Sequence, residues 1–269
     1  IPLEAPHVRY LRNESNRNFA GACNQGAAAA QGRFLVFLNN DTIPLEGWLD
    51  HLVDEVRSRP EVVMVGSRLL YESGVVQHAG IAFTRDDRSP HHPYRFLRAE
   101  DPRVNRRREL QAVTAACVLV RPRWFQDCGG FHEGFRNGYE DLDLCLHIRQ
   151  RGGVIVYQPR SVLFHLESQT PGRMRHDNEN RRLFFERWEH AVLSDEDSFY
   201  FEDGCRIARH RPGRPEAPRL IRFESDADRQ AWNNVAQTQR LAAAGQREEL
   251  LKVPQQPPTM FTKPFRAQS

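Results

Sequence analysis

The chain has 269 residues, 39% of them hydrophobic, which is enough to bury one sizeable core and predicts a single domain with appendages. Its formal charge of +3, from 38 basic and 35 acidic residues, is too balanced to indicate a nucleic-acid-binding protein. No stretch approaches the ~18 consecutive apolar residues of a membrane-spanning helix. The five cysteines are scattered, which argues against a disulfide framework or a zinc site and favours a cytoplasmic protein.

Apolar runs and helical periodicities alternate along most of the chain. Strands are predicted where apolar residues run together, and helices where they recur every three or four positions. The expected strands are residues 7–11, 34–38, 62–65, 68–71, 75–83, 113–120, 154–157 and 161–165. The expected helices are residues 19–30, 48–59, 122–128, 140–151 and 180–192. This alternation predicts an α/β domain over residues 1–193.

Two segments depart from this alternation. Residues 84–110 are polar and are expected to form a mobile functional loop. Within it, His91 and His92 stand between prolines and are interpreted as solvated, with metal ligation as the alternative. Residues 194–269 form a C-terminal extension that either wraps the domain or engages a protein partner, with a helix expected over 226–251 and a disordered tail.

Polar side chains close two predicted strands and open one predicted helix. They are Asn39, Asn40 and Asp41 after the strand at 34–38, Glu140 and Asp141 at the start of the helix at 140–151, and His165 at the end of the last strand. A carboxylate, an imidazole and diphosphate oxygens suit Mn²⁺ or Mg²⁺, and a second carboxylate can take a proton from an attacking hydroxyl. The alternatives are a turn, a stabilised helix N-terminus and a hydrogen-bonded core histidine.

Six short segments carry a more specific pattern by their order and spacing. They are residues 16–26 (NRNFAGACNQG), 38–42 (LNNDT), 115–121 (AACVLVR), 129–133 (GGFHE), 139–145 (YEDLDLC) and 162–165 (VLFH). Together they resemble family 2 glycosyltransferases of the GT-A fold, and within them the bacterial rhamnosyltransferase-like branch that builds surface polysaccharides. The resemblance implies a mostly parallel, Rossmann-like sheet flanked by helices. It also implies an N-terminal βαβ portion that binds the nucleobase, which is expected to be missing because the chain starts just after it.

The resemblance assigns metal-binding roles to two residues. Asp41 matches the last acid of the family's DXD motif, which contacts the metal on the nucleotide diphosphate, and Asn39 stands in place of the first acid. His165 matches a histidine that completes the metal shell in several members. The implied cofactor is Mn²⁺ or Mg²⁺.

The resemblance also implies catalytic and substrate-binding roles. Asp141 matches the general base of the family's ED motif, and Glu140 orients it or contacts a sugar. The residues expected to approach the nucleotide-sugar are Asn16, Arg17, Asn24, Asn39, Asn40 and Asp41.

The activity implied is that of an inverting glycosyltransferase. An acceptor hydroxyl deprotonated by Asp141 displaces the nucleoside diphosphate from the opposite face of the donor sugar. The expected partners are a nucleotide-sugar donor and a saccharide or lipid-linked acceptor, with peripheral association at the inner face of the membrane and a protein partner for residues 194–269. The alternative is a catalytically silent GT-A-like module that binds carbohydrate or acts as a scaffold, which Asn39 and the missing front portion favour.

Overall fold

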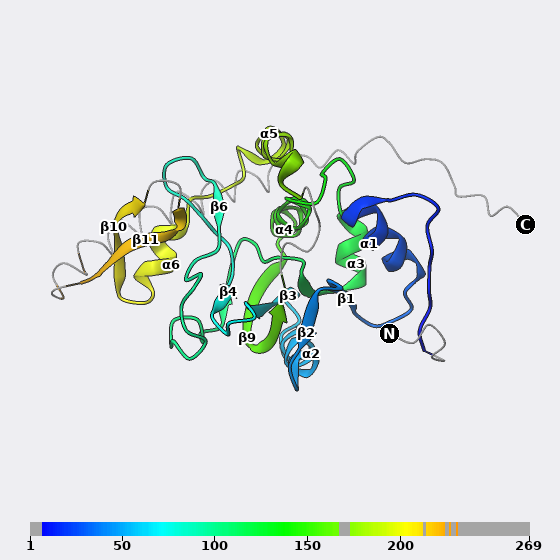
Figure 1. The fold of residues 1–269 in the computed structure, drawn as a ribbon, viewed down its shortest axis with the longest axis horizontal. Helices are drawn as coiled ribbons and strands as arrows, with labels where there is room; N and C mark the ends of the chain where they lie inside the picture. Colours follow the sequence, from blue (N-terminus) through cyan, green and yellow to red (C-terminus); the bar gives the residue numbers. More distant parts are fainter. Residues whose placement is uncertain (1–6, 167–172, 212–213, 224–225, 227–229, 231–269) are drawn as a thin grey trace, which may run out of the picture.

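A seven-stranded sheet forms the centre of the computed structural model, which describes residues 7–166, 173–211, 214–223, 226 and 230 (Figure 1). Its order is β1 (Leu35–Leu38), β8 (Cys117–Val120), β3 (Val62–Leu70), β9 (Val154–His165) and β2 (Thr42–Pro44), with β4 (Val76–His78) beside β3 and β7 (Arg108–Glu109) beside β9. The long apolar runs become its central strands, since both faces are covered by helices. The predicted α/β class is confirmed.

The strand directions differ from those expected. The pairing of β3 with β9 is parallel, whereas β1–β8, β8–β3, β3–β4, β9–β2 and β7–β9 are antiparallel. The sheet is therefore mixed, and the expectation of a mostly parallel sheet needs correcting. Parallel neighbours require a crossover of a dozen or more residues, whereas the link from β3 to β4 is a short turn. Apolar runs identify strands but carry no information on their direction.

Helices cover both faces of the sheet. They are α1 (Asn18–Ala29), α2 (Trp48–Ser58), α3 (Pro122–Asp127), α4 (Glu140–Gln150), α5 (Asp177–Trp188) and α6 (Glu196–Phe201), with a 3₁₀ turn over Arg173–His176. Helix α2 lies on one face, where Leu52 and Val56 pack against strand residues such as Val65, and α4 and α5 lie on the other (Figure 1). Among the described residues, no helix is long and apolar enough to cross a membrane.

Residues 84–110 are packed against the domain, contrary to the expected mobile and solvated loop. Strands β5 (Ala82–Phe83) and β6 (Pro90–His91) form a two-stranded hairpin at its start. Tyr94 and Val104 are 4% and 0% exposed, so the segment contributes to the core. Several of its arginines pair with acids elsewhere in the chain, such as Arg85 with Asp197 and Arg107 with Glu55, a compensation that local polarity does not reveal.

The C-terminal extension begins as part of the same core. Phe199 and Tyr200 of α6 are buried in it, so packing continues past residue 193, where the domain was expected to end. A hairpin of β10 (Cys205–Arg211) and β11 (Arg214–Arg222) follows. The helix expected over 226–251 lies outside the described residues except for residues 226 and 230, and the expected tail lies wholly outside them.

A buried ion pair fastens this extension to residues 84–110. Arg108 Nη2 donates to both Asp203 oxygens at 2.7 and 2.6 Å, and the two side chains are 3% and 1% exposed. Asp203 also accepts from Arg106 Nη1 at 2.6 Å and from the Tyr94 hydroxyl. Arg108 Nη1 donates to Glu202 at 2.9 Å, but the Glu202 side chain is 42% exposed.

We predict that Asp203→Asn lowers the free energy of unfolding by about 3 kcal/mol, because it leaves the buried Arg108 guanidinium without its only buried counter-charge among the described residues. Glu202→Gln is the matched control, since it removes an exposed partner of the same arginine and is expected to cost less than about 1 kcal/mol. Urea unfolding of both variants measures the difference. Equal losses in the two variants would contradict the dominance of the buried pair.

Candidate active site

A cavity of about 540 Å³ opens at the edge of the sheet where β1 and β9 end. Seven of the residues singled out in the sequence line it: Asn16, Asn39, Asn40, Asp41, Glu140, Asp141 and His165. The remaining wall comes from the hairpin of β5 and β6, the segment before β8 and the starts of α1 and α5. Lining residues up to 164 positions apart in the chain, Asn16 and Asn180, thus meet at one site, as expected for the ligand-binding edge of an α/β sheet.

Strand pairing brings Asp41 beside His165. Thr42 of β2 is the register partner of His165 in β9, and the Leu166 amide donates to the Asp41 carbonyl at 2.9 Å. The Thr42 hydroxyl closes the turn by donating to the Asn39 carbonyl at 2.6 Å. As a result, Asp41 Oδ1 lies 3.3 Å from His165 Nε2.

Gln77 determines which ring nitrogen of His165 carries the proton. The Gln77 amide nitrogen donates to the His165 carbonyl at 3.1 Å, which can only accept, so the Gln77 oxygen must be the group that faces His165 Nδ1 at 2.7 Å. An amide oxygen accepts, and therefore Nδ1 carries the hydrogen. The neutral ring then presents the Nε2 lone pair toward Asp41, which is the tautomer of a histidine metal ligand whose other nitrogen is hydrogen-bonded.

The polar groups of the cavity suit a divalent cation. Asp41 Oδ1 is buried and has no hydrogen-bond partner among the described residues, and it faces a second lone pair at His165 Nε2. No group of three or more His, Cys, Asp or Glu that could hold a metal occurs in the described part of the chain. Asp41 and His165 would therefore hold Mn²⁺ or Mg²⁺ only together with oxygens of a substrate or water. Asn39 Nδ2 lies 3.5 Å from His165 Nε2.

The lining of the cavity is acidic. Four carboxylates contribute to it, those of Asp41, Glu140, Asp141 and Asp177, and no arginine or lysine is among the described lining residues. An anionic ligand therefore meets repulsion unless a bound cation or neutral N–H donors offset it.

Glu140 and Asp141 occupy the first turn of α4 in different environments. Asp141 accepts hydrogen bonds from the backbone amides of Ala115 at 3.1 Å and Leu142 at 2.9 Å, which fix its carboxylate at the helix N-terminus. Glu140 is 3% exposed and its Oε1 has no hydrogen-bond partner among the described residues. Burial, with a smaller contribution from the charge of Asp141, raises the pKa of Glu140 to about 7.

Arg17 and Asn24 do not line the cavity, although both were expected near the nucleotide. Arg17 is exposed just before α1. Asn24 exchanges hydrogen bonds with the backbone of Phe131, donating to its carbonyl and accepting from its amide, both at 2.9 Å. Asn24 therefore anchors the segment after α3 to α1. This packing role cannot be predicted from a polar residue within a helix of small residues.

Several lining residues were not singled out from the sequence as site residues. They are Asn18, Phe19, Ile81, Pro90, His91, His92, Thr114, Ala115, Ala116, Asn137, Gly138, Tyr139, Leu142, Asp177 and Asn180. His91 was interpreted as solvated, but it is 4% exposed, so that interpretation is wrong. Asn137 and Tyr139 have φ angles of 56° and 74°, a left-handed conformation that is uncommon outside glycine and often marks functional loops. The glycine- and aromatic-rich run at residues 131–139 is the sequence feature that could have drawn attention to these two residues.

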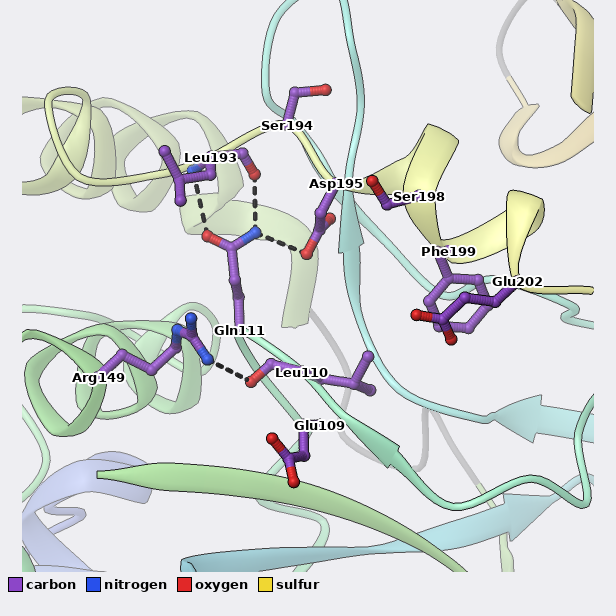
Figure 2. A pocket seen from close by; sticks show the side chains of 10 residues that line it. All are labelled: Glu109, Leu110, Gln111, Arg149, Leu193, Ser194, Asp195, Ser198, Phe199 and Glu202. Carbon is purple, nitrogen blue, oxygen red and sulfur yellow. Dashed lines mark hydrogen bonds between the residues drawn. The ribbon is translucent and has the colours of Figure 1, made fainter. Parts of the chain in front are cut away.

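A smaller cavity of about 210 Å³ lies where the extension meets the domain (Figure 2). Gln111 stands at its centre, donating to the Leu193 carbonyl at 2.7 Å and to Asp195 at 2.6 Å, and accepting from the Leu193 amide at 3.1 Å. These bonds fasten residues 193–195 to the domain. The described lining of this cavity contains none of the four carboxylates of the larger cavity. Its acidic residues are Glu109, Asp195 and Glu202.

Residues 3–128 match the family model described as glycosyl transferase family 2. Residues 3–128 therefore belong to glycosyl transferase family 2. The chain is 35% identical over 158 residues to the O-antigen biosynthesis protein RfbC of Myxococcus xanthus, covering 56% of this chain and 12% of that protein. It is 26% identical over 162 residues to the pre-mycofactocin glycosyltransferase of Mycobacterium tuberculosis, covering 59% of this chain and 32% of that protein.

The family 2 chain is also similar to a solved structure, the crystal structure of GalNAc-T7 with UDP, GalNAc and Mn²⁺. The TM-score is 0.48 at 15% sequence identity, over 68% of this chain and 40% of that chain. The chain thus spans less than half the length of each of these proteins.

Titration of Glu140 is predicted to reduce the stability of the domain as pH rises. Because its folded pKa of about 7 lies above the ordinary 4.5, the protonated form is favoured on folding; this contribution is complete below pH 4.5 and is lost as pH rises through 7. Relative to Glu140→Gln, the wild type should lose about 3 kcal/mol of unfolding free energy across this window. Urea unfolding at pH 5 and pH 8 without divalent cations measures this, and parallel pH profiles would contradict it.

Proposed function

We propose that this family 2 domain transfers a sugar from a nucleotide-diphosphate donor to a hydroxyl of a glycan or other saccharide, with inversion at the anomeric carbon. The observation that carries the proposal is the convergence of the Asp41–His165 pair and the Glu140–Asp141 pair on one cavity. The first pair is suited to a cation on the diphosphate, and the second supplies a base for the acceptor.

Asp141 is the proposed general base. Its oxygens accept hydrogen bonds from the backbone amides of Ala115 and Leu142, which orient the carboxylate at the cavity wall. It removes the proton of the acceptor hydroxyl as that oxygen bonds to the anomeric carbon. The bond from this carbon to the diphosphate oxygen breaks, and the nucleoside diphosphate leaves with the electron pair.

Asp41 and His165 are the proposed protein ligands of Mn²⁺ or Mg²⁺. When bound, the cation neutralises the charge that develops on the departing diphosphate. Gln77 holds the His165 ring with its Nε2 lone pair toward Asp41, and Asn39 and Asn40 supply amide groups at the same end of the cavity. The absence of Arg and Lys from the described lining favours such a cation over basic side chains as the diphosphate partner.

The acceptor class is proposed from the process named for a relative. The chain is similar to an O-antigen biosynthesis protein, which supports a polysaccharide of the bacterial cell envelope as the acceptor or product. Asn39, which stands in place of the first acid of the motif, supports the alternative of a silent carbohydrate-binding module. The two functions make opposite predictions for donor turnover.

The full chain is predicted to consume at least one donor in a panel of UDP-, GDP- and dTDP-sugars with Mn²⁺. Asp141→Asn should lower the rate by about 10²–10⁴-fold, because a positioned base contributes that much. Nucleoside diphosphate release measures the rate. Asp127→Asn is the control, since this acid is 45% exposed on α3 and outside the cavity, and it should leave the rate unchanged. Nucleotide binding without turnover of any donor would sink the enzyme proposal and leave the silent module.

Gln77→Leu is predicted to weaken Mn²⁺ binding by about tenfold, because the His165 ring loses the hydrogen bond that fixes its tautomer and orientation. Gln77→Glu keeps an acceptor at Nδ1 and should retain more of the affinity. Calorimetric titration of Mn²⁺ in the presence of UDP, GDP or dTDP measures both variants. Unchanged affinity in Gln77→Leu would show that Nε2 is not a ligand or needs no such support.

A further inference from the structure

The segment that precedes α4 is held at the wall of the larger cavity by contacts with two other helices. Asn180 of α5 accepts from the Arg136 amide and donates to the Arg136 carbonyl, both at 3.0 Å. Asn137 accepts from the Phe19 amide of α1 at 3.3 Å. Residues 137–139 line the cavity. The conformation in which this segment meets the cavity is therefore determined by long-range hydrogen bonds.

Tyr139 ends this segment in a backbone conformation that is costly for an aromatic residue. Its φ angle of 74° is left-handed, which outside glycine often marks a functional position. Its ring packs against Phe184 of α5, with the ring centroids 5.3 Å apart. Its hydroxyl forms no hydrogen bond with any described residue, although Tyr139 lines the cavity. Packing uses the ring alone, so the hydroxyl is available to a ligand.

Asp177 lies on the face of α5 that contacts this segment. Residues three or four positions apart share a helix face, and Asp177 stands one turn before Asn180 and two turns before Phe184. It lines the cavity, and its carboxylate forms no hydrogen bond or ion pair with a described residue. Burial first, and then the charge of Asp177, raise the pKa of Tyr139 to about 12, so the hydroxyl is protonated at neutral pH and can donate.

The charges around Tyr139 favour a neutral ligand in this part of the cavity. Asp177, Asp87 and Asp141 all act on its hydroxyl, and Arg181, which acts in the opposite sense, is paired with Asp87 at 2.8 Å. A diphosphate would be repelled by these carboxylates. A sugar is not repelled, because its hydroxyls can donate to a carboxylate and accept from a tyrosine.

We propose that Tyr139 and Asp177 form a subsite for the acceptor saccharide, in which the tyrosine hydroxyl donates to one sugar oxygen and the carboxylate accepts from another sugar hydroxyl. The inference rests on the proposed function and adds the residues that recognise the acceptor. It commits to the acceptor because Tyr139 stands two residues before Asp141, the proposed base, and the charge of Asp141 reaches its hydroxyl.

The test separates acceptor binding from donor binding. The full chain is assayed with Mn²⁺ and the nucleotide-sugar that it consumes, and methyl glycosides of glucose, galactose, mannose, rhamnose and N-acetylglucosamine serve as acceptor probes. Tyr139→Phe should raise the KM for the accepted glycoside about tenfold, because it removes a hydrogen bond to the sugar, and should leave the KM for the donor near the wild-type value. Asp177→Ala should have the same effect.

Each substitution has a matched control outside the cavity. Tyr10→Phe removes a hydroxyl from a side chain that is 62% exposed, and Asp50→Ala removes a first-turn acid from α2 instead of α5. Both controls should keep the wild-type KM for the glycoside and for the donor. Thermal unfolding of each variant verifies that it is folded.

Three results would overturn the inference and leave the transferase proposal intact. The first is a folded Tyr139→Phe variant with the wild-type KM for the glycoside, and the second is a variant in which only the KM for the donor rises. The third is a wild-type chain that consumes a donor but transfers its sugar to none of the glycosides. If the wild type consumes no donor, the proposed function and the inference fail together.

Discussion

The contact between Asp41 and His165 imposes the main electrostatic constraint on the site. The register of β2 against β9 places Asp41 Oδ1 3.3 Å from His165 Nε2, and Gln77 keeps the hydrogen of that ring on the other nitrogen. Two acceptors at this distance repel each other unless a proton, a cation or a donor such as the Asn39 amide, 3.5 Å from His165 Nε2, offsets the repulsion. The backbone pairing that places the two side chains together is part of the sheet itself, so only a rotation of a side chain such as that of Asp41 could separate them.

The remaining acids increase the same demand for positive charge. Glu140, Asp141 and Asp177 line the cavity with Asp41, and the described lining offers no basic side chain in return. Under the proposed function, a cation and an anionic diphosphate would strengthen each other's binding, because each removes repulsion that the other would meet. Glu140 contributes least to this field near neutral pH, since burial raises its pKa to about 7 and leaves it partly protonated. This environment gives adjacent carboxylates different states, with Asp141 held by backbone amides and Glu140 shielded from water.

The sequence was sufficient to predict the α/β class and to place seven residues on one cavity, because apolar runs mark strands and polar residues at their ends mark the binding edge. It could not predict the strand directions, which depend on connections and neighbours. It also misplaced Asn24, whose amide satisfies the backbone of Phe131, a contact 107 residues away. His91 and His92 were missed for the same reason: their polar neighbours resemble those of a solvated loop, and burial comes from the distant α6 and β4.

The site also depends on residues beyond the family match, which ends at residue 128. Asp41 and His92 lie before that point, and Asp141 and His165 lie after it. The extension contributes no described lining residue, yet it holds the hairpin that carries His92: Asp195 accepts from the Phe83 amide at 2.8 Å, and Glu196 and Asp197 both bond Arg85. Burial raises the pKa of Asp195 to about 6. The start of the extension is therefore physically part of the domain, because it holds the hairpin together with Arg181 of α5, which donates to Asp87 and Ser89.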